Sequence, residues 1–346
     1  MESRTRGSNL MTKIPALAVA AGLVLAASAA SAQDKPMVLK FAGWAPPQIN
    51  VNIVSQRWAK QVEAASGGTV KIQFFWNSIA NARTVYDVVR TGVADIGWIL
   101  QPLVRGKFRK TSVVALPFLV RNSTEGSVAL WNLYSKGLIS GEYDQVKPLG
   151  IAALPPSIIH SRRPVARLAD VEGMKFRIAG RVNAQMISTL KATGVQMAIT
   201  GVYQAMSKGV INGSISPWLG FTAFKHQEVT THHVEVPMGA IAGMTAMNNQ
   251  TWARLPAKAK AAFTKYSFAK LSRDYGEICD KDVAFNRGKV AGLKGHKIVS
   301  FSKAEIASMK SRFKPIEAAW VKSTPGGAKI LGAMNEELAK FRAMKK

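Results

Sequence analysis

The sequence predicts an α/β protein built largely on parallel strands, and three observations lead to this fold class. From residue 37 onward, short apolar strands alternate with amphipathic helices at the spacing of a βα repeat. Several of the strands are apolar on both faces, as strands are in a parallel sheet that helices cover on both sides. With 346 residues and 47% hydrophobic content, the chain is long enough for about two domains with real cores.

The first part of the chain predicts strands separated by two helices. The first helix starts at Asn50, which can cap it, and stops at the Ser66-Gly67-Gly68 segment. The second helix carries apolar residues at 85, 88 and 89 and ends near Gly92. The expected strands are residues 38–42, 70–74, 94–100 and 113–116.

A second βα series follows Pro155 and Pro156. Its expected strands are residues 174–178, 195–197 and 211–215, and its expected helices are residues 182–191 and 203–208. Beyond Pro256 the composition changes to long Ala- and Lys-rich helical stretches, which a strand at residues 296–301 interrupts. The pattern shows no internal repeat and no low-complexity tract.

The first 32 residues predict an export signal. Arg4, Arg6 and Lys13 precede an uncharged apolar stretch, residues 14–27, and small residues follow it up to Ala32. The apolar stretch is shorter than the roughly 20 residues of a membrane-spanning helix, and much of it is alanine, which argues against a membrane anchor. We therefore expect cleavage after Ala32 and a mature chain outside the cytoplasm.

The charge balance is strongly basic. The chain has 47 Lys and Arg against 20 Asp and Glu, a formal net charge of +27. This balance implies an anionic ligand, nucleic acid or membrane surface nearby. Export and the absence of any nucleic-acid-binding signature weigh against nucleic acid, so we expect most of the excess charge to be solvated surface.

Signatures of catalysis and of metal or cofactor binding are missing from the sequence. It contains no GxGxxG after a strand, no GxxxxGK[ST], no HExxH and no GxSxG. His232 and His233 are adjacent, so in a strand they would point to opposite faces and could not chelate one ion. The single cysteine, Cys279, can form neither an intramolecular disulfide nor a cysteine-based metal site. We expect no catalytic residue, no metal and no cofactor.

Arg177 is the strongest candidate for a binding residue. It alternates with the apolar residues of the strand 174–178, and a cation there needs an anionic partner. No acidic residue occurs between Phe176 and Gln227, so a ligand carboxylate is favoured over a structural ion pair. Trp44, Trp98 and Trp218 lie at ends of expected strands, where open α/β sheets bind ligands, although core packing is the alternative for each.

The chain resembles the periplasmic solute-binding proteins of tripartite ATP-independent periplasmic (TRAP) transporters, the DctP-like family. The similarity runs from Leu39 to about Trp252, with a helical remainder that is compatible with it. It is carried by six blocks in the family's order: LKFA at 39–42, SGGTVKI at 66–72, GVADIGW at 92–98, ALPFL at 115–119, GMKFR at 173–177, and VYQAM at 202–206 followed by GVING at 209–213.

The resemblance implies a two-lobe solute-binding fold of the Venus-flytrap type, with hinge strands and a long helix that spans both lobes. Lobe I is expected at residues 33–154 plus about 241–282, and lobe II at residues 155–240 plus about 283–346. The lobes would close on a small carboxylate ligand, and the protein would deliver it in the periplasm to the TRAP membrane permease. We expect a monomer in solution.

The resemblance also assigns roles to site residues. The arginine of the family's G-x-K-x-R strand holds the ligand carboxylate, and this position is Arg177. The resemblance places Leu100, Ser157 and Ser216 at further ligand-binding positions. Because the sialic-acid-binding branch has other polar anchors at these positions, the resemblance argues against sialic acid as the ligand. Another departure is Asn212-Gly213, where the family block ends in Asp-Gly. The residues expected near the cleft favour a monocarboxylate with an apolar or aromatic body; they are Trp44, Trp98, Ile99, Leu100, Phe118 and Trp218.

Three alternatives stay open. A sensor subunit of the same fold would present its ligand to a signalling receptor. A secreted hydrolase would use His232 or His233 as a base, without a companion nucleophile signature. A basic surface-interaction protein would bind anionic polymer in a strongly salt-dependent way.

Overall fold

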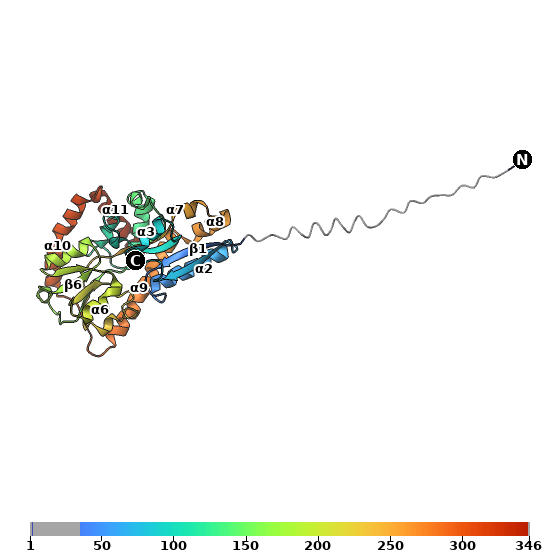
Figure 1. Ribbon diagram of the computed structural model, residues 1–346. Helices are drawn as coiled ribbons and strands as arrows, with labels where there is room; N and C mark the ends of the chain where they lie inside the picture. Colours follow the sequence, from blue (N-terminus) through green and yellow to red (C-terminus); the bar gives the residue numbers. More distant parts are fainter. Residues whose placement is uncertain (1, 3–34, 345–346) are drawn as a thin grey trace. The chain divides into compact units, whose positions relative to one another are not determined.

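The computed structural model describes residue 2 and residues 35–344, so the expected export signal lies outside the described residues apart from Glu2. The body of the fold begins at Met37. In it, two β-sheets and ten α-helices form an α/β fold, which confirms the fold class that the sequence predicts (Figure 1). No helix of this described part is long and apolar enough to cross a membrane.

The first sheet has five strands in the order β2-β1-β3-β10-β4. Its strands are β1 (Met37–Gly43), β2 (Val70–Trp76), β3 (Ile96–Leu100), β4 (Lys147–Ala153) and β10 (Ala242–Met247). β1 pairs in parallel with β2 and β3, whereas β10 is antiparallel to both of its neighbours. The helices in and beside this part of the chain are α2 (Asn50–Ala65), α3 (Val85–Arg90), α4 (Ser123–Ser135), α7 (Asn249–Ala253) and α8 (Ala257–Tyr266).

The second sheet has six strands in the order β11-β9-β5-β8-β6-β7. Its strands are β5 (Ile158–Ser161), β6 (Lys175–Ile178), β7 (Thr193–Gln196), β8 (Gly213–Ser216), β9 (His232–Val234) and β11 (Lys297–Val299). β6 pairs in parallel with β7 and β8, and β5 is antiparallel to β8 and β9. The helices α5 (Arg181–Thr189) and α6 (Val202–Ser207) connect its parallel strands.

Two local predictions are wrong. Residues 113–116, expected as a strand, belong mostly to the 3-10 helix η2 (Thr111–Ala115), because a short apolar run does not distinguish a buried strand from a buried helical turn. Asn50 is the first residue of α2 and not its cap; the cap position is Ile49, which makes no side-chain cap. The Asn50 amide instead donates to the Asp282 carboxylate on the helix α9 (Ala269–Ala291).

Two antiparallel chain segments connect the sheets. One runs from β4 to β5 and the other from β9 to β10. The backbone N–H of Leu154 donates to the carbonyl of Ile241 at 2.8 Å, and that of Ser157 donates to the carbonyl of Gly239 at 2.8 Å. Gly239 has a φ of +76°, and a Cβ there would lie 2.0 Å from the carbonyl oxygen of Ala115. Only glycine fits this crossing without a shift of the backbone.

A long helix, α9 (Ala269–Ala291), contacts elements of both sheets. Its first half packs against α2, α4 and β4. Near its other end, the Asp282 carboxylate accepts from the backbone N–H of Gly220 at 2.7 Å, and Asn286 accepts from that of Thr222 at 3.0 Å. Gly220 and Thr222 follow β8, so one rigid helix is anchored to both parts of the fold.

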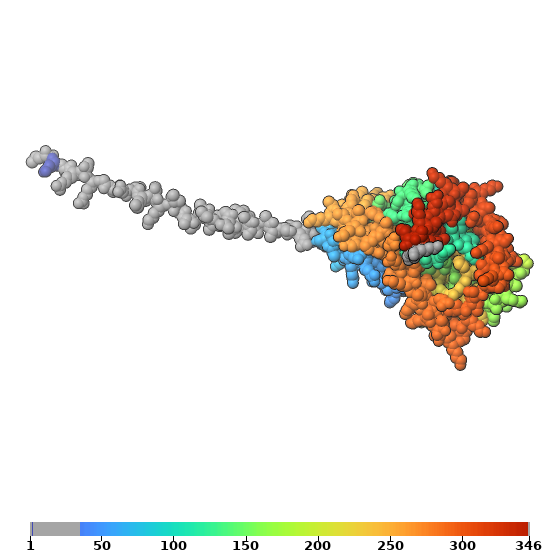
Figure 2. Space-filling model, turned by 180° about the vertical axis from the view of Figure 1, so that it is seen from behind, coloured from blue at the N-terminus to red at the C-terminus, as the bar shows by residue number. Residues whose placement is uncertain are grey.

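The C-terminal helices are α10 (Lys303–Ser323) and α11 (Gly327–Ala343). Seen from behind, the orange and red C-terminal part covers much of the surface (Figure 2). α10 packs on α5, beside the second sheet, whereas α11 packs on α4, beside the first. The two sheets divide the chain near the expected boundaries at 154 and 241, but the exact lobe boundaries stay a prediction.

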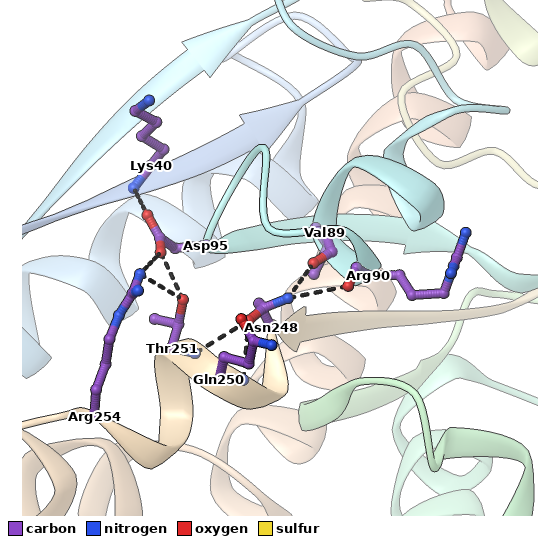
Figure 3. A network of polar contacts seen from close by, with 8 residues as sticks. All are labelled: Lys40, Val89, Arg90, Asp95, Asn248, Gln250, Thr251 and Arg254. Atoms are coloured by element: carbon purple, nitrogen blue, oxygen red, sulfur yellow. Dashed lines mark hydrogen bonds and ion pairs between the residues drawn. The ribbon is translucent and has the colours of Figure 1, made fainter.

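A polar network fastens the return of the chain after β10 to the first sheet (Figure 3). Asp95 accepts from the backbone N–H of Lys40 at 2.9 Å and from the hydroxyl of Thr251 at 2.7 Å. Arg254 reaches the same carboxylate at 3.3 Å. The Asn248 side chain caps α7 and donates to the carbonyl of Val89 at 2.9 Å. We assign the network a structural role, because the side chains of Asp95, Asn248, Thr251 and Arg254 all bond to other groups of the protein.

Candidate functional site

Arg177 lies inside the second sheet, on β6. Its neighbour Lys175 is exposed, whereas only 2% of Arg177 is accessible to solvent. Phe176 and Ile178 are buried on the other face of the strand, as the alternation predicts. The guanidinium of Arg177 is therefore buried in the interior of the protein.

The polar partners of Arg177 are all neutral. Its Nε donates to the carbonyl oxygen of Met197 at 3.0 Å, and its Nη1 donates to the carbonyl oxygen of Ile215 at 3.3 Å. None of the ion pairs among residues 35–344 includes Arg177. Burial lowers the pKa of Arg177 to about 10, so the group is still a cation at neutral pH. The structure therefore holds a desolvated positive charge that no carboxylate of the described chain matches.

Arg177 borders a small cavity of about 50 Å³ between the two sheets. The other lining residues are all apolar or aromatic, and they come from parts of the chain next to both sheets and from both crossing segments. They are Trp44, Ala45, Ile49, Val51, Trp98, Leu100, Leu154, Ile199, Pro217, Leu219, Phe224 and Ile241. We call this space the arginine cavity. Its chemistry suits a ligand with one anionic end and an apolar body.

Two tryptophans form the wall contributed by the first sheet. The indole Nε1 of Trp44 donates to the backbone carbonyl of Trp98 at 2.8 Å, which fixes the ring at the end of β1. The ring of Trp98 packs on Tyr275 of α9, with centroids 4.7 Å apart. The hydroxyl of Tyr275 is held in turn by Ser55 at 2.7 Å and Thr245 at 2.6 Å. The wall is therefore rigid and supported by three elements.

Of the eight candidate site residues, four line the arginine cavity and four do not. The four that line it are Arg177, Trp44, Trp98 and Leu100. The side chain of Phe118 packs toward Phe313, and that of Trp218 packs with Phe221 and donates to Glu235 at 3.2 Å. Ser157 and Ser216 are buried in or beside β5 and β8. The hydroxyl of Ser216 bonds to that of Ser214 at 3.0 Å, whereas the hydroxyl of Ser157 has no partner in the described chain.

Several lining residues were not expected from the sequence. Ile199, Pro217, Leu219 and Phe224 lie in short connections after strands of the second sheet. Such connections carry no periodic pattern, so apolar residues in them give no signal by themselves. Pro217 and Leu219 flank Trp218, so the segment that carries this candidate borders the cavity, whereas the Trp218 side chain itself does not line it.

Histidines form a separate cluster behind β5 and β9. His160 and His233 face each other with their Nδ1 atoms 2.9 Å apart, and Nε2 of His233 lies 3.0 Å from Nδ1 of His296. Burial lowers the pKa of His233 to about 3, which keeps it neutral. Among the described residues, no group of three or more His, Cys, Asp or Glu side chains is arranged to hold a metal ion. His232, on the other side of β9, is half-exposed and bonds to Thr231.

Comparisons with known proteins show the family to which the chain belongs. The family model described as bacterial extracellular solute-binding protein, family 7 (DctP) matches residues 41–323. A solute-binding protein of Roseobacter denitrificans is 25% identical over 80% of this chain and 89% of its own. The C4-dicarboxylate-binding periplasmic protein DctP of Rhodobacter capsulatus is 25% identical over 72% of this chain and 76% of its own.

Solved structures of TRAP solute-binding proteins have the same fold. One from a marine metagenome, specific for aromatic acid ligands, is 28% identical with a TM-score of 0.84 and covers 88% of this chain and 99% of its own. One from Rhodoferax ferrireducens, in complex with copurified benzoate, is 25% identical with a TM-score of 0.85 and covers 90% and 100%. One from Bordetella bronchiseptica, with bound mandelate, is 25% identical with a TM-score of 0.83 and covers 88% and 100%. The chain therefore belongs to the DctP family, family 7 of the bacterial extracellular solute-binding proteins.

Proposed function

We propose that this protein captures an organic acid with a single carboxylate and an aromatic or apolar body, and that it delivers this acid to a TRAP membrane permease. The observation that carries the proposal is the buried guanidinium of Arg177, which borders the arginine cavity without an acidic partner among the described residues. A ligand carboxylate supplies the missing charge and can accept two parallel hydrogen bonds from the guanidinium fork.

The lining of the cavity defines the rest of the ligand. Among residues 35–344, no second cation lines it, so a second carboxylate of a dicarboxylic acid would be buried without a partner. Trp44, Trp98 and Phe224 offer aromatic surface to a ring. Relatives of similar fold support this ligand class, because their structures contain benzoate, mandelate and hydroxybenzoate.

Capture works by closure of the two lobes. The arginine cavity takes Trp44 and Trp98 from the first sheet, Arg177 from the second, and Leu154 and Ile241 from the crossing segments. A ligand that touches all three parts binds the closed state more tightly than the open state. Its binding therefore shifts the equilibrium toward the closed state, to the extent set by this difference in affinity. No chemical step is required of the protein.

Export and partners complete the proposal. The mature protein begins at Gln33 in the periplasm, acts as a monomer and docks on the permease subunits of its transporter. Mass spectrometry of the periplasmic fraction tests the first part, with a chain that starts at or within two residues of Gln33 as the expected result. An intact Met1 would contradict export by a cleavable signal.

A thermal-shift screen over organic acids tests the ligand class. A ligand at 100 times its Kd adds about 2.7 kcal/mol to the apparent free energy of unfolding. We expect benzoate, 3-hydroxybenzoate and mandelate to raise the melting temperature, and succinate, sialic acid and the uncharged control benzyl alcohol to leave it unchanged. Equal stabilisation by benzyl alcohol and benzoate would refute the anchoring of a carboxylate, and stabilisation by succinate alone would refute the monocarboxylate preference.

A further inference from the structure

Two hollows lie beside the arginine cavity, along the segment that follows β3. The first, of about 310 Å³, is lined by residues from the segment 101–115, the start of α5, the crossing residues 240–242 and the end of α10. The second, of about 670 Å³, is lined by residues of α3, the segment 103–107, Gln145 and Gln196. Val104 and Lys107 line both, so the two hollows are neighbours. We call them the seam hollows.

The seam hollows lie where segments next to the two sheets meet, and they adjoin the arginine cavity. A Cβ on Gly180, after β6, would lie 3.0 Å from the Cβ of Pro102, after β3. Ile241 lines both the first hollow and the arginine cavity. The residue after Gln196, which lines the second hollow, accepts a hydrogen bond from Nε of Arg177 at 3.0 Å through its carbonyl. Charges around these hollows therefore act on an anion that approaches Arg177.

The charged side chains that line the seam hollows are basic with one exception. The exception is Asp87, which forms an ion pair with Arg90 at 3.2 Å. The other five charged residues are cations, and none of them takes part in an ion pair among residues 35–344. We call these five the cationic rim: Arg83, Arg105, Lys107, Arg109 and Arg181.

The contacts of the rim residues leave its charge in place. The four rim arginines are exposed to solvent. The Lys107 ammonium donates to the neutral side chain of Gln145 at 3.3 Å. Glu142 lines neither hollow, and its carboxylate accepts from two backbone N–H groups at 2.6 and 2.9 Å. The cations of the rim therefore outnumber the acids beside them.

Arg181 occupies a position that helix stability does not favour. It is the first residue of α5, at the end where the peptide dipoles sum to a partial positive charge. The first turn of this helix has no acidic residue, and its N-cap provides no side-chain cap. A cation at this position is therefore locally unfavourable for the helix, and it adds to the positive field at the first hollow.

The positive charge is not uniform around the arginine cavity. A third hollow, of about 310 Å³, shares Ile49 with the cavity and is lined by the start of α2, residues 220–223 and part of α9. Of the described residues that line it, Asp282 is the only charged one. The basic composition of the whole chain, with a formal net charge of +27, therefore does not by itself account for the cationic rim.

We propose that the cationic rim steers anionic ligands into the arginine cavity and raises the rate at which they bind. This inference rests on the proposed function, because it takes a carboxylate as the ligand. Charges of one sign along a cleft reinforce one another, attract the oppositely charged ligand and raise association rates by about 10-fold to 1,000-fold. The rim does not contact the bound ligand; it favours anions over neutral analogues during the approach, before Arg177 selects the carboxylate in the complex.

Stopped-flow fluorescence measures the association rate constant kon and the dissociation rate constant koff of benzoate, with Trp44 and Trp98 in the cavity as reporters. We expect kon of the wild type to fall about tenfold or more between about 10 mM and about 1 M salt, since the Debye length shrinks from about 30 Å to about 3 Å. A kon that does not depend on salt, with benzoate bound, would contradict steering alone. Absence of benzoate binding at equilibrium would contradict the proposed function, and the inference with it.

Two triple variants locate the effect, and each lowers the net charge by three. The rim variant is Arg105→Gln, Arg109→Gln and Arg181→Gln. The matched control is Arg57→Gln, Lys60→Gln and Lys265→Gln, three exposed cations that line a groove between α2 and α8 and none of the seam hollows. Because all six residues are exposed and outside the ion pairs of the described chain, both variants should keep the melting temperature of the wild type.

At about 10 mM salt we expect kon of the rim variant to be about threefold to tenfold lower than that of the wild type, and kon of the control variant to be nearly unchanged. At about 1 M salt the three proteins should have the same kon, and koff should be the same at both salt concentrations. Equal losses of kon in the two variants would assign the effect to total charge and overturn the role of the rim. A raised koff with unchanged kon in the rim variant would show direct contact with the bound ligand and would overturn steering as well.

Discussion

Arg177 and Trp44 line the same cavity from different sheets: Arg177 lies on β6 of the second sheet, and Trp44 directly follows β1 of the first. The tryptophan is fixed by its hydrogen bond to Trp98, and the arginine by two backbone carbonyls. The cation and the aromatic wall can therefore contact one ligand only when the two sheets are close together.

Ligand binding should compact the protein. The crossing segments join the sheets through a few backbone hydrogen bonds, so they can act as a hinge when the arginine cavity is empty. We expect small-angle scattering of the mature chain to show a smaller radius of gyration with saturating benzoate than without it. An unchanged radius, with binding verified by calorimetry, would contradict hinge closure.

Trp44→Leu should weaken aromatic ligands selectively. The substitution removes an aromatic face from the cavity, and such contacts contribute about 0.5–1.5 kcal/mol, so benzoate affinity should fall about threefold to tenfold. Acetate, which has no ring, should be affected much less. Trp218→Leu is the matched control, because Trp218 does not line the arginine cavity. An equal loss in Trp218→Leu would place Trp218 in the ligand wall, as the sequence predicts.

Gly239→Ala should destabilise the crossing segment severely. Gly239 and Gly106 both have positive φ values, +76° and +74°, which cost a non-glycine residue about 1–2 kcal/mol. Only at Gly239 does a Cβ meet backbone, the carbonyl of Ala115, whereas nothing lies within 4 Å of a Cβ at Gly106. We expect urea denaturation to show a loss in Gly239→Ala that exceeds the loss in Gly106→Ala by roughly 2 kcal/mol or more. Equal losses would contradict the close approach.

Stability should fall as the pH drops below about 6.5. Burial lowers the pKa of His226 and His233 to about 3, and it lowers the pKa of His160 well below its ordinary value. These groups are neutral when folded, whereas the unfolded chain protonates them below a pH of about 6.5. The unfolded state then binds more protons, so the free energy of unfolding decreases with decreasing pH through this window.

Denaturation between pH 7 and pH 4.5 measures this effect. At pH 5 His226 and His233 should together account for uptake of about two protons on unfolding, because each is almost fully protonated only in the unfolded chain, and His160 should add to this uptake because burial lowers its pKa as well. In His226→Gln the slope of stability against pH should decrease by about one proton. An unchanged slope in that variant would mean that His226 is already protonated in the fold.

The sequence was sufficient for the regular elements with a strong pattern. Examples are the period of two at β2, the apolar stripe of α2 and the alternation at β6. Each of these patterns lies within one short segment of the chain, so it can be recognised without knowing which distant segments pack against it. Arg177 could be selected as a candidate binding residue because a cation in an apolar strand and a shortage of nearby acids are both visible in the sequence, and its burial without an acidic partner agrees with that selection.

The remaining features depend on contacts between distant segments. β10 is not among the strands that the sequence predicts. It is buried on both faces, and such a strand has the same apolar pattern in a parallel and in an antiparallel sheet, so its direction could not be predicted either. Val113 and Val114 are buried in a helical turn that a four-residue run cannot distinguish from a strand. Ile199 and Phe224 reach the cavity from irregular segments, and the contact between His160 and His233 follows from the pairing of β5 with β9.

Calorimetric titration of benzoate against the mature wild-type chain, Arg177→Met and Lys175→Met tests the central claim most directly. Methionine keeps much of the apolar stem of either side chain and removes its charge, and Lys175 is the exposed cation two residues away on the same strand. We predict a fall in affinity of 10-fold to 100-fold or more in Arg177→Met, from loss of charge-assisted hydrogen bonds of about 1.5–3 kcal/mol each, and no change in Lys175→Met. Without ligand, Arg177→Met should be as stable as the wild type or more so, since it removes an unmatched buried charge. Undiminished benzoate affinity in Arg177→Met would contradict the role of Arg177 as the carboxylate anchor.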